Sequence, residues 1–226
     1  MAHRFNGMSV ERRFCLLIIA RSENSKMSSE GGHAQSNQQL IDQAFCGIQA
    51  LAERMRGETA GTIARAAELI HCAIKSGNKI LACGNGGSAA EAQHFIGELV
   101  GRFLTEREPL AGVALTVDTS VLTAVGNDYG YSEVFTRQVK GIGKPGDVLL
   151  AISTSGQSSN VLKALAAARD GGLVTIALIG AESSLELDVC DLVITIPDPS
   201  TPRIQEMHLV VLHLICELVD NALTTV

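Results

Sequence analysis

Two pairs of side chains that can bind a metal ion or move a proton stand on two predicted helices. His94 and Glu98 are four residues apart, so on a helix they share one face, one turn apart. Such a pair can chelate a metal ion, but it can equally be a hydrogen-bonded pair at the surface. Gln205 and His213, with His208 between them, stand on a predicted C-terminal helix. Their separation of eight residues does not single them out, because two histidines on an amphipathic helix are more often structural.

The residues around these pairs indicate which side of each helix faces the interior. Glu91 and Gln93 stand near the first pair and are expected on the solvent-facing side of their helix. The C-terminal helix carries an apolar stripe made of Leu209, Leu212 and Cys216. That helix should therefore pack inward, and a polar side chain beside the stripe needs a hydrogen-bonding partner.

Two loops rich in glycine and hydroxyl groups each follow a short apolar segment that is typical of a strand. The first is Gly84–Ser88, after Lys79–Cys83, and the second is Ser153–Ser158, after Asp147–Ile152. Glycines let backbone N–H groups approach a phosphate, and the N-terminus of the following helix adds unpaired N–H groups and a positive dipole end. Each loop alone is compatible with an ordinary helix cap or tight turn. Two such loops after two strands of one sheet favour a phosphate site.

The spacing around the first loop argues against a nucleotide. The chain has no G-x-x-x-x-G-K-[ST] motif, which excludes a P-loop site. Residues 84–89 match the G-x-G-x-x-A variant of a dinucleotide-binding loop. However, Asp118, the acid after the next predicted strand, follows Gly84 by 34 residues, where a ribose-binding acid is expected after about 20. The hydroxyl-rich second loop also suits a single phosphate better than a pyrophosphate.

From residue 36 the sequence alternates between helical and strand patterns. Helices are predicted at Gln39–Arg54, at Thr59–Lys75, from the first loop through Glu98 or beyond, at Asn160–Arg169, and from Arg203 to Leu223. Strands are predicted at Lys79–Cys83, Gly112–Val117, Asp147–Ile152, Leu173–Ile179 and Asp191–Ile196. The strands are continuous apolar runs, which is typical of parallel strands buried on both faces. We therefore expect one α/β domain with a five-stranded parallel sheet in three αβα layers, extra N-terminal helices, and a ligand site at the carboxyl ends of the strands.

The composition excludes several classes of protein. Apolar residues make up 46% of the 226 residues and charged residues 19%, which rules out a disordered chain. The net charge is −6, and residues 1–26 hold five Lys and Arg against two Glu, so the rest of the chain is more acidic still. An acidic body argues against a nucleic-acid partner, because phosphate binding needs clustered Lys and Arg. No apolar run approaches the roughly 18 residues of a membrane span, which argues against a membrane partner.

The cysteines and the N-terminal segment indicate a cytoplasmic protein. The six cysteines form no Cys-x-x-Cys pair and most lie in apolar context, which is typical of reduced, buried cysteines and argues against a zinc–thiolate site. Phe14–Ala20 resembles a weak secretory segment, but no small-residue cleavage pattern follows it, and Met27 is an alternative start. Residues 1–35 are expected to be a disordered N-terminal extension, and residues 36–226 to form the folded domain.

Four short motifs, in this order, resemble those of one family. They are Cys-Gly-Asn-Gly-Gly-Ser at 83–88, Gly-Asn-Asp at 126–128, Ile-Ser-Thr-Ser-Gly at 152–156 and Arg-Ile-Gln-Glu at 203–206. Each motif alone is modest, but together they make the chain resemble the phosphoheptose isomerases of the sugar-isomerase (SIS) domain family. The resemblance covers residues 36–226 and implies a single SIS domain.

The resemblance also implies a reaction and a metal. The reaction is the aldose–ketose isomerisation of sedoheptulose 7-phosphate and D-glycero-D-manno-heptose 7-phosphate through an enediol, which needs a base at carbon and an acid/base group at oxygen. By resemblance, Glu98 is the base at carbon and His213 is the acid/base partner. One Zn²⁺ ion per subunit is implied, with the ligands His94, Glu98, Gln205 and His213.

The resemblance assigns the substrate to both loops. The implied phosphate-binding residues are Ser153, Thr154, Ser155 and Ser158. The other implied substrate-binding residues are Asn85, Gly86, Gly87, Glu98, Asn127, Asp128 and Gln205. From the residues alone, the Asn-Asp pair at 127–128 can equally be a turn signal.

The resemblance further implies a homotetramer with sites at subunit interfaces, for which apolar faces on the two N-terminal helices offer a reason. Two alternatives of other classes stay open. One is a non-catalytic SIS regulator resembling the replication-initiator-associating protein of bacteria, which shares much of the loop sequence. The other is a sugar-phosphate sensor that binds without turnover. The discriminating feature is the acid/base pair, because this chain has both Glu98 and His213 and the regulator lacks that pair.

Overall fold

A computed structural model describes residues 35–181 and 190–224 of the chain. The chain divides into two units, one up to Ala52 and one from Glu53 onwards, and each is described by itself. Helix α2 (Asn37–Glu58) begins in the first unit, where Leu40, Ile41 and Phe45 are exposed apolar side chains. The predicted disorder of the N-terminal extension falls on residues that lie outside the described part, apart from Gln35.

The second unit is built on a sheet of five parallel strands in the order β2-β1-β3-β4-β5. The strands are β1 (Ile80–Gly84), β2 (Gly112–Ala114), β3 (Val148–Ser153), β4 (Val174–Gly180) and β5 (Leu192–Ile196). Every residue of β1 and of β3 is buried, as continuous apolar runs predict for central parallel strands. The predicted five-stranded parallel sheet is therefore confirmed, with β2 ending three residues earlier than expected.

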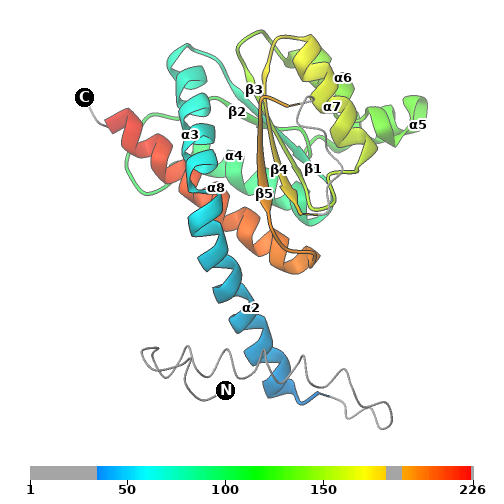
Figure 1. Ribbon diagram of the computed structural model, residues 1–226. Helices are drawn as coiled ribbons and strands as arrows, with labels where there is room; N and C mark the ends of the chain where they lie inside the picture. Colours follow the sequence, from blue (N-terminus) through cyan, green and yellow to red (C-terminus); the bar gives the residue numbers. More distant parts are fainter. Residues whose placement is uncertain (1–34, 182–189, 225–226) are drawn as a thin grey trace. The chain divides into compact units, whose positions relative to one another are not determined.

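Helices cover both faces of the sheet, which gives the predicted three αβα layers (Figure 1). On one face lie α3 (Ala60–Lys75), α4 (Gly87–Val100) and α8 (Thr201–Thr224). On the other lie α6 (Thr136–Ile142) and α7 (Ser159–Asp170), over a buried cluster that includes Leu81, Cys83, Leu149 and Ala151. Because side chains alternate along a strand, the intervening residues of β1 and β3 point to the α4 and α8 face.

The segment between β2 and β3 is more helical than the sequence predicts. It contains α5 (Thr119–Tyr129) and a short 3-10 helix, η2 (Tyr131–Glu133), in addition to α6. Asp118 caps α5, since its Oδ1 accepts a hydrogen bond from the Val121 backbone N–H at 2.9 Å. No residue of α5 is fully buried, and only the partly buried Leu122 and Val125 pack against the core, which is too short an apolar stripe to predict the helix from the sequence.

Three surface features correct or qualify the sequence analysis. Cys83 and Cys216 are buried as predicted, but Cys72 is exposed, because it lies on the outer side of α3. Leu209 was expected in the inward stripe of α8 and is 36% exposed, since the buried face of α8 runs through other positions. α8 is long and apolar enough to cross a membrane by length and composition, a criterion that the core helix of a globular domain also meets.

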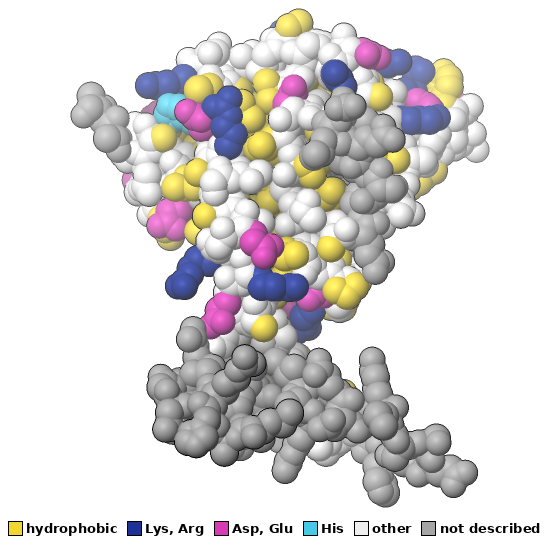
Figure 2. All heavy atoms as spheres, viewed as in Figure 1, with side chains coloured by type: hydrophobic (Ala, Val, Ile, Leu, Met, Phe, Trp, Pro, Cys, Tyr) yellow, Lys and Arg dark blue, Asp and Glu magenta, His cyan; other side chains and the backbone are white. Residues whose placement is uncertain are grey.

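Among the described residues on the face in view, Lys and Arg are interspersed with Asp and Glu and do not form a patch of one charge (Figure 2).

Candidate active site

Three side chains that can bind a metal or move a proton meet between α4 and α8. The Nε2 atoms of His94 on α4 and His213 on α8 lie 2.8 Å apart. The Nε2 atom of His94 also lies 3.5 Å from Oε1 of Glu98, one turn further along α4. One ligand atom from each of the three residues lies within 4.8 Å of the others. The helical spacing of the first pair and its meeting with His213 therefore agree with the sequence analysis.

The two helices are held in this arrangement by their buried faces and by a loop residue. On α4, Phe95 and Leu99 are fully buried beside the exposed His94. On α8, Leu212 is fully buried beside the half-buried His213. Phe103, from the loop after α4, stacks on the His213 ring with centroids 5.4 Å apart and an interplanar angle of 29°.

Gln205, on the first turns of α8, lies against the start of α4. A Cβ atom built at Gly87 would stand 2.2 Å from Nε2 of Gln205, so only a glycine leaves room for the amide. The spacing between Gln205 and His213 in the sequence does not single out Gln205. The structure places its side chain directly on the first glycine loop, one of the two loops to which the substrate was assigned.

A buried polar pair lies beside this group and corrects one expectation. Glu91 was expected on the wet side of α4, but it is only 9% exposed, and its Oε2 lies 3.2 Å from Nδ1 of His208 on α8. His208 is fully buried, and its Nε2 has no hydrogen-bond partner among the described residues. The expectation was wrong because α8 covers this side of α4. Gln93 is exposed as expected, and its Nε2 donates to Oγ1 of Thr116 at 3.2 Å.

The second loop, Ser153–Ser158, has hydroxyl groups that can donate to an anion. Oγ of Ser153 accepts from the backbone N–H of Gly156 at 3.1 Å, and Oγ of Ser155 accepts from that of Gln157 at 3.2 Å. A hydroxyl that accepts in this way keeps its own O–H free to donate. The loop leads into the N-terminus of α7 with Ser158 as the N-cap, where unpaired N–H groups and the helix dipole favour negative charge.

The fourth strand supports this loop from behind. The backbone N–H of Gly180 donates to the carbonyl oxygen of Thr154 at 3.1 Å. A Cβ atom at Gly180 would stand 2.4 Å from that oxygen, so the approach requires glycine. The position of Thr154 is therefore set by the end of β4 as well as by the loop itself.

A pair of amides joins the first loop to the start of α7, and only one of them, Asn85, was predicted from the sequence. The side chains of Asn85 and Asn160 exchange two hydrogen bonds of 2.8 Å each. Tyr131 on η2 donates its hydroxyl to Oδ1 of Asn85 at 3.1 Å. Asn160 is 2% exposed and stands at the start of α7. An asparagine in the first turn of a helix that follows a phosphate loop was the one signal that could have marked Asn160.

Asn127 and Asp128 lie at the C-terminal end of α5 and are exposed. Nδ2 of Asn127 donates to Oδ1 of Asp128 at 2.8 Å. They therefore lie at a helix end, where the chain leaves α5 and enters η2. The following residues lead directly to Tyr131, whose hydroxyl contacts the first loop.

The donor set fits a zinc ion. Two imidazole nitrogens and a carboxylate oxygen converge, and these are ligand types that zinc takes at distances of about 2.0–2.2 Å. Two imidazole nitrogens 2.8 Å apart carry a hydrogen atom between them when no cation is bound, because two lone pairs repel. The Gln205 amide lies instead at Gly87, seven residues and about two turns before His94 along α4.

The buried thiols near the site do not take part in acid–base chemistry at neutral pH. Burial raises the pKa of Cys83, on β1 before the first loop, to about 12. Burial, and next the nearby negative charges of Glu98 and Asp220, raise the pKa of Cys216 on α8 to about 12. Both thiols therefore stay protonated at neutral pH.

Comparison with known proteins places the chain in a family. Residues 45–180 match the SIS domain. A phosphoheptose isomerase of Rhodospirillum rubrum is 53% identical over 180 residues, which cover 80% of this chain and 96% of the relative. The solved phosphoheptose isomerase of Neisseria gonorrhoeae is 40% identical, with a TM-score of 0.77 over 82% of this chain and 100% of that one. That of Francisella tularensis is 35% identical, with a TM-score of 0.79 over 83% and 100%. These likenesses do not favour the regulator or the sensor, and the chain belongs to the phosphoheptose isomerases of the SIS domain family.

Proposed function

We propose that the chain is an aldose–ketose isomerase that interconverts sedoheptulose 7-phosphate and D-glycero-D-manno-heptose 7-phosphate, for heptose precursor biosynthesis. The observation that carries this proposal is the convergence of His94, Glu98 and His213 between α4 and α8. This convergence supplies a carboxylate and imidazoles for proton transfer, and two of the three residues stand on the helix that follows the first glycine loop. The names of the relatives agree with this activity.

In the proposed reaction a proton moves between adjacent carbons without net oxidation. The Glu98 carboxylate removes a proton from C1 of the ketose, the C1–C2 bond becomes double, and the oxygen on C2 takes a proton from His213. Glu98 then returns its proton to C2, while His213 accepts the proton from the oxygen on C1, which becomes the aldehyde. The 3.5 Å separation of Glu98 from His94, and the contact of His94 with His213, support a shared site for both transfers.

The phosphate is proposed to bind the second loop through the hydroxyls of Ser153, Thr154, Ser155 and Ser158. The hydroxyl groups of this loop, of which those of Ser153 and Ser158 lie 3.5 Å apart, and the N-terminus of α7 support this assignment. The remaining hydroxyls of the sugar are proposed to contact Asn85, Gly86, Gly87, Asn127, Asp128 and Gln205. The amide pair of Asn85 and Asn160 fixes the first loop relative to the second, so that the reacting end and the phosphate end of one substrate can be bound at once.

One zinc ion per subunit is proposed to be held by His94, Glu98, Gln205 and His213. When bound, zinc polarises the oxygens on C1 and C2 and stabilises the negative charge that develops on them. Gln205 offers only a neutral amide oxygen, which a substrate oxygen can replace more easily than a carboxylate. With the metal held there, proton transfer would use the Glu98 oxygen and the His213 ring nitrogen that do not bind it, and the second loop still anchors the phosphate.

A homotetramer in the cytoplasm, with active sites at subunit interfaces, is also proposed. The exposed apolar side chains of Leu40, Ile41 and Phe45 on α2 support further association, since side chains of this size are usually covered. Analytical ultracentrifugation at micromolar concentration tests the assembly, and a monomer would contradict it. No nucleic-acid or membrane partner is proposed.

The activity is tested by incubating the purified, metal-assayed protein with sedoheptulose 7-phosphate in deuterated water. Product formation and deuterium at C2 of the aldose are expected, because the proton on Glu98 exchanges with solvent. Glu98→Gln should abolish turnover while calorimetry still detects binding of the phosphosugar. Glu68→Gln, at an exposed carboxylate on α3, is the matched control and should keep wild-type activity. Absence of exchange in the zinc-loaded wild-type protein would contradict the proposal and favour a non-catalytic regulator.

A further inference from the structure

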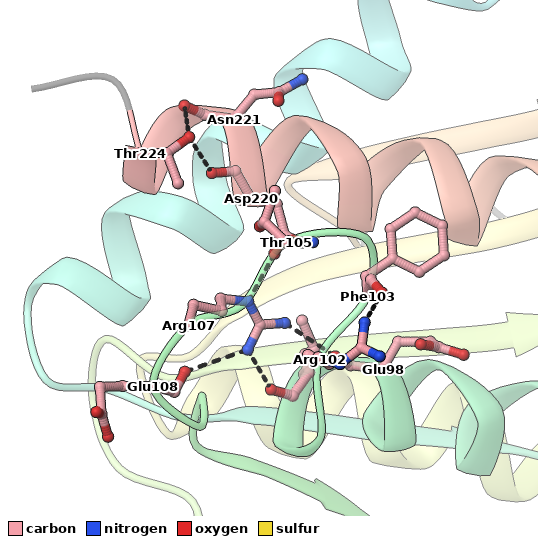
Figure 3. A network of polar contacts seen from close by, with 10 residues as sticks. Glu98, Arg102, Phe103, Thr105, Arg107, Glu108, Asp220, Asn221 and Thr224 are labelled. Carbon is pink, nitrogen blue, oxygen red and sulfur yellow. Dashed lines mark hydrogen bonds and ion pairs between the residues drawn. The ribbon is translucent and has the colours of Figure 1, made fainter.

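One arginine joins the two helices that carry the candidate site (Figure 3). The Arg107 side chain is 7% exposed and lies between the C-terminal end of α4 and the last turns of α8. Its Nε donates to Oδ1 of Asp220 on α8 at 2.6 Å. Its Nη2 and Nη1 donate to the backbone carbonyls of Glu98 and Leu99, at 2.9 Å each. These carbonyls belong to the last turn of α4, where no intrahelical donor is available to them.

Both carboxylate oxygens of Asp220, the partner of Arg107, accept hydrogen bonds. Asp220 has a side chain only 2% exposed, and its Oδ2 accepts from Oγ1 and the backbone N–H of Thr105, at 3.1 and 3.4 Å. Burial raises the pKa of Asp220, but the hydrogen bonds from Arg107 and Thr105 outweigh it and hold the pKa below its ordinary value. The pair is therefore charged at neutral pH. Two residues of loop 101–108, Thr105 and Arg107, are hydrogen-bonded to Asp220 of α8.

The same loop touches α8 again beside the proposed acid/base group. Phe103 stacks on His213, and the ring of Phe103 lies alongside α8 in Figure 3. His213 and Asp220 are seven residues apart, so they lie about two turns apart on the same side of the helix. The terminal torsion of a histidine side chain is broad and weakly restrained by itself, so a ring packed on its face decides its plane.

We propose that loop 101–108 is a positioning element of the active site, in which Phe103 fixes the plane of the His213 imidazole and the Arg107–Asp220 pair fixes the spacing of Glu98 and His213. The inference rests on the proposed function, because it concerns how that site is held. Phe103 acts through His213, and Arg107 acts through the last turn of α4. Neither side chain belongs to the loop that is proposed to bind the phosphate.

The test compares Phe103→Leu with the wild-type protein in three measurements. kcat should fall about 10-fold, because small displacements of a catalytic group cost rate steeply. KM should stay within about 2-fold, because binding of the phosphate is untouched. The affinity for zinc, measured by competition with a chromophoric chelator, should weaken about 10-fold, as it does when a partner that orients a ligand is lost. Phe103→Tyr keeps an aromatic face and should restore both kcat and zinc affinity.

Leu104→Ala is the matched control for Phe103. Leu104 is the next residue in the same loop and is 64% exposed, so its truncation changes the loop without touching His213. Its kcat, KM and zinc affinity should equal those of the wild-type protein. Melting temperatures of all variants, measured without zinc, separate a loss of position from a loss of fold.

Arg107→Lys tests the second half of the inference. A lysine keeps the charge but cannot bind Asp220 and two carbonyls at the same time. Its control is Lys79→Gln, which breaks the ion pair of Lys79 with Asp147 at the amino ends of β1 and β3, a pair that contacts neither Arg107 nor Asp220. Where both variants lower the melting temperature, only Arg107→Lys should also lower kcat and zinc affinity of the folded protein.

The outcomes separate this inference from the function on which it rests. A wild-type protein without turnover overturns the proposed function and this inference with it. A wild-type protein with turnover, whose Phe103→Leu variant matches Leu104→Ala in kcat and zinc affinity, overturns the inference alone. A Phe103→Tyr variant whose kcat and zinc affinity stay as low as those of Phe103→Leu also overturns the inference alone. If Arg107→Lys does not fold, the Phe103 series still decides the role of the loop.

Discussion

The Nε2 atoms of His94 and His213 lie 2.8 Å apart, although 119 positions separate the two residues in the sequence. One of these nitrogens must carry a hydrogen atom when no cation is bound, and a zinc ion would replace that hydrogen bond with two bonds to the metal. The contact between α4 and α8 therefore depends on what occupies the site. This dependence leads to predictions about metal binding, about the glycine beside Gln205 and about the polar pairs around the site.

His94→Gln should weaken zinc binding by at least about 100-fold, since it removes a ligand rather than one of the outer groups whose loss costs about 10- to 100-fold. The affinity is measured by competition with a chelating dye. His71→Gln, on α3 outside this group, is the control and should bind zinc like the wild-type protein. Equal affinities in the two variants would exclude His94 from the metal site.

Gly87→Ala should displace Gln205 without unfolding the protein. The added Cβ would stand 2.2 Å from Nε2 of Gln205, and that flexible amide can move while the backbone stays in place. Turnover should fall about 10-fold with little change in melting temperature. Gly97→Ala is the control, because a Cβ there meets open space.

If Gln205 is the group through which Gly87 acts, the two substitutions must not be additive. The double variant Gly87→Ala with Gln205→Ala should be no slower than Gln205→Ala alone. Additive losses would show that Gly87 acts on turnover by a route other than Gln205.

Much of the fold could be predicted because burial on both faces leaves a clear trace in the sequence. β1 and β3 are fully buried and appear as unbroken apolar runs, and the glycines at their carboxyl ends marked the loops. α5 could not be predicted in this way, because only Leu122 and Val125 of that helix pack against the core. The exposure of Cys72 could not be predicted from the sequence either, since a small thiol can lie on the buried or the exposed side of a helix.

The candidate site could be predicted only where one helix holds both partners. His94 and Glu98 follow from the helical repeat, whereas His213 came from the resemblance, and its contact with His94 depends on how α4 packs on α8. Arg107 and Asp220 are 113 positions apart, and their contact exists only in the folded chain. Long-range contacts of this kind have no local spacing from which they could be recognised.

Asn160→Asp should impair substrate binding more than Asn160→Ala does. Both substitutions lose the hydrogen bond that Nδ2 of Asn160 donates to Asn85. Only the aspartate also places a negative charge at the N-terminus of α7, beside the proposed phosphate site. KM for sedoheptulose 7-phosphate should rise about 10-fold more in the aspartate variant, which corresponds to about 1.4 kcal/mol. Equal KM values in the two variants would argue against phosphate binding at this loop.

Asp147→Asn should destabilise the protein at neutral pH and much less in acid. Burial raises the pKa of Asp147, but hydrogen bonds from Lys79 and Lys144 outweigh it, so the pKa of the folded state lies below the ordinary value. Its stabilisation is therefore fully present above about pH 4, the pKa in the unfolded chain, and is lost as pH falls through the lower folded value. Urea unfolding from pH 7 downwards should show the two proteins converging below about pH 4. A constant difference would contradict this assignment.

Glu91→Leu should cost about 1–3 kcal/mol of unfolding free energy, because it leaves the polar Nδ1 of His208 buried without its partner. Replacing both partners, as in Glu91→Leu with His208→Phe, should recover most of this loss, since no unpaired polar group remains. The comparison uses urea unfolding at one fixed protein concentration, because any association of subunits makes the apparent stability depend on concentration. If the loss of unfolding free energy in the double variant equals the sum of the losses in Glu91→Leu and His208→Phe, the two side chains are not coupled. The buried contact between α4 and α8 then does not depend on this pair.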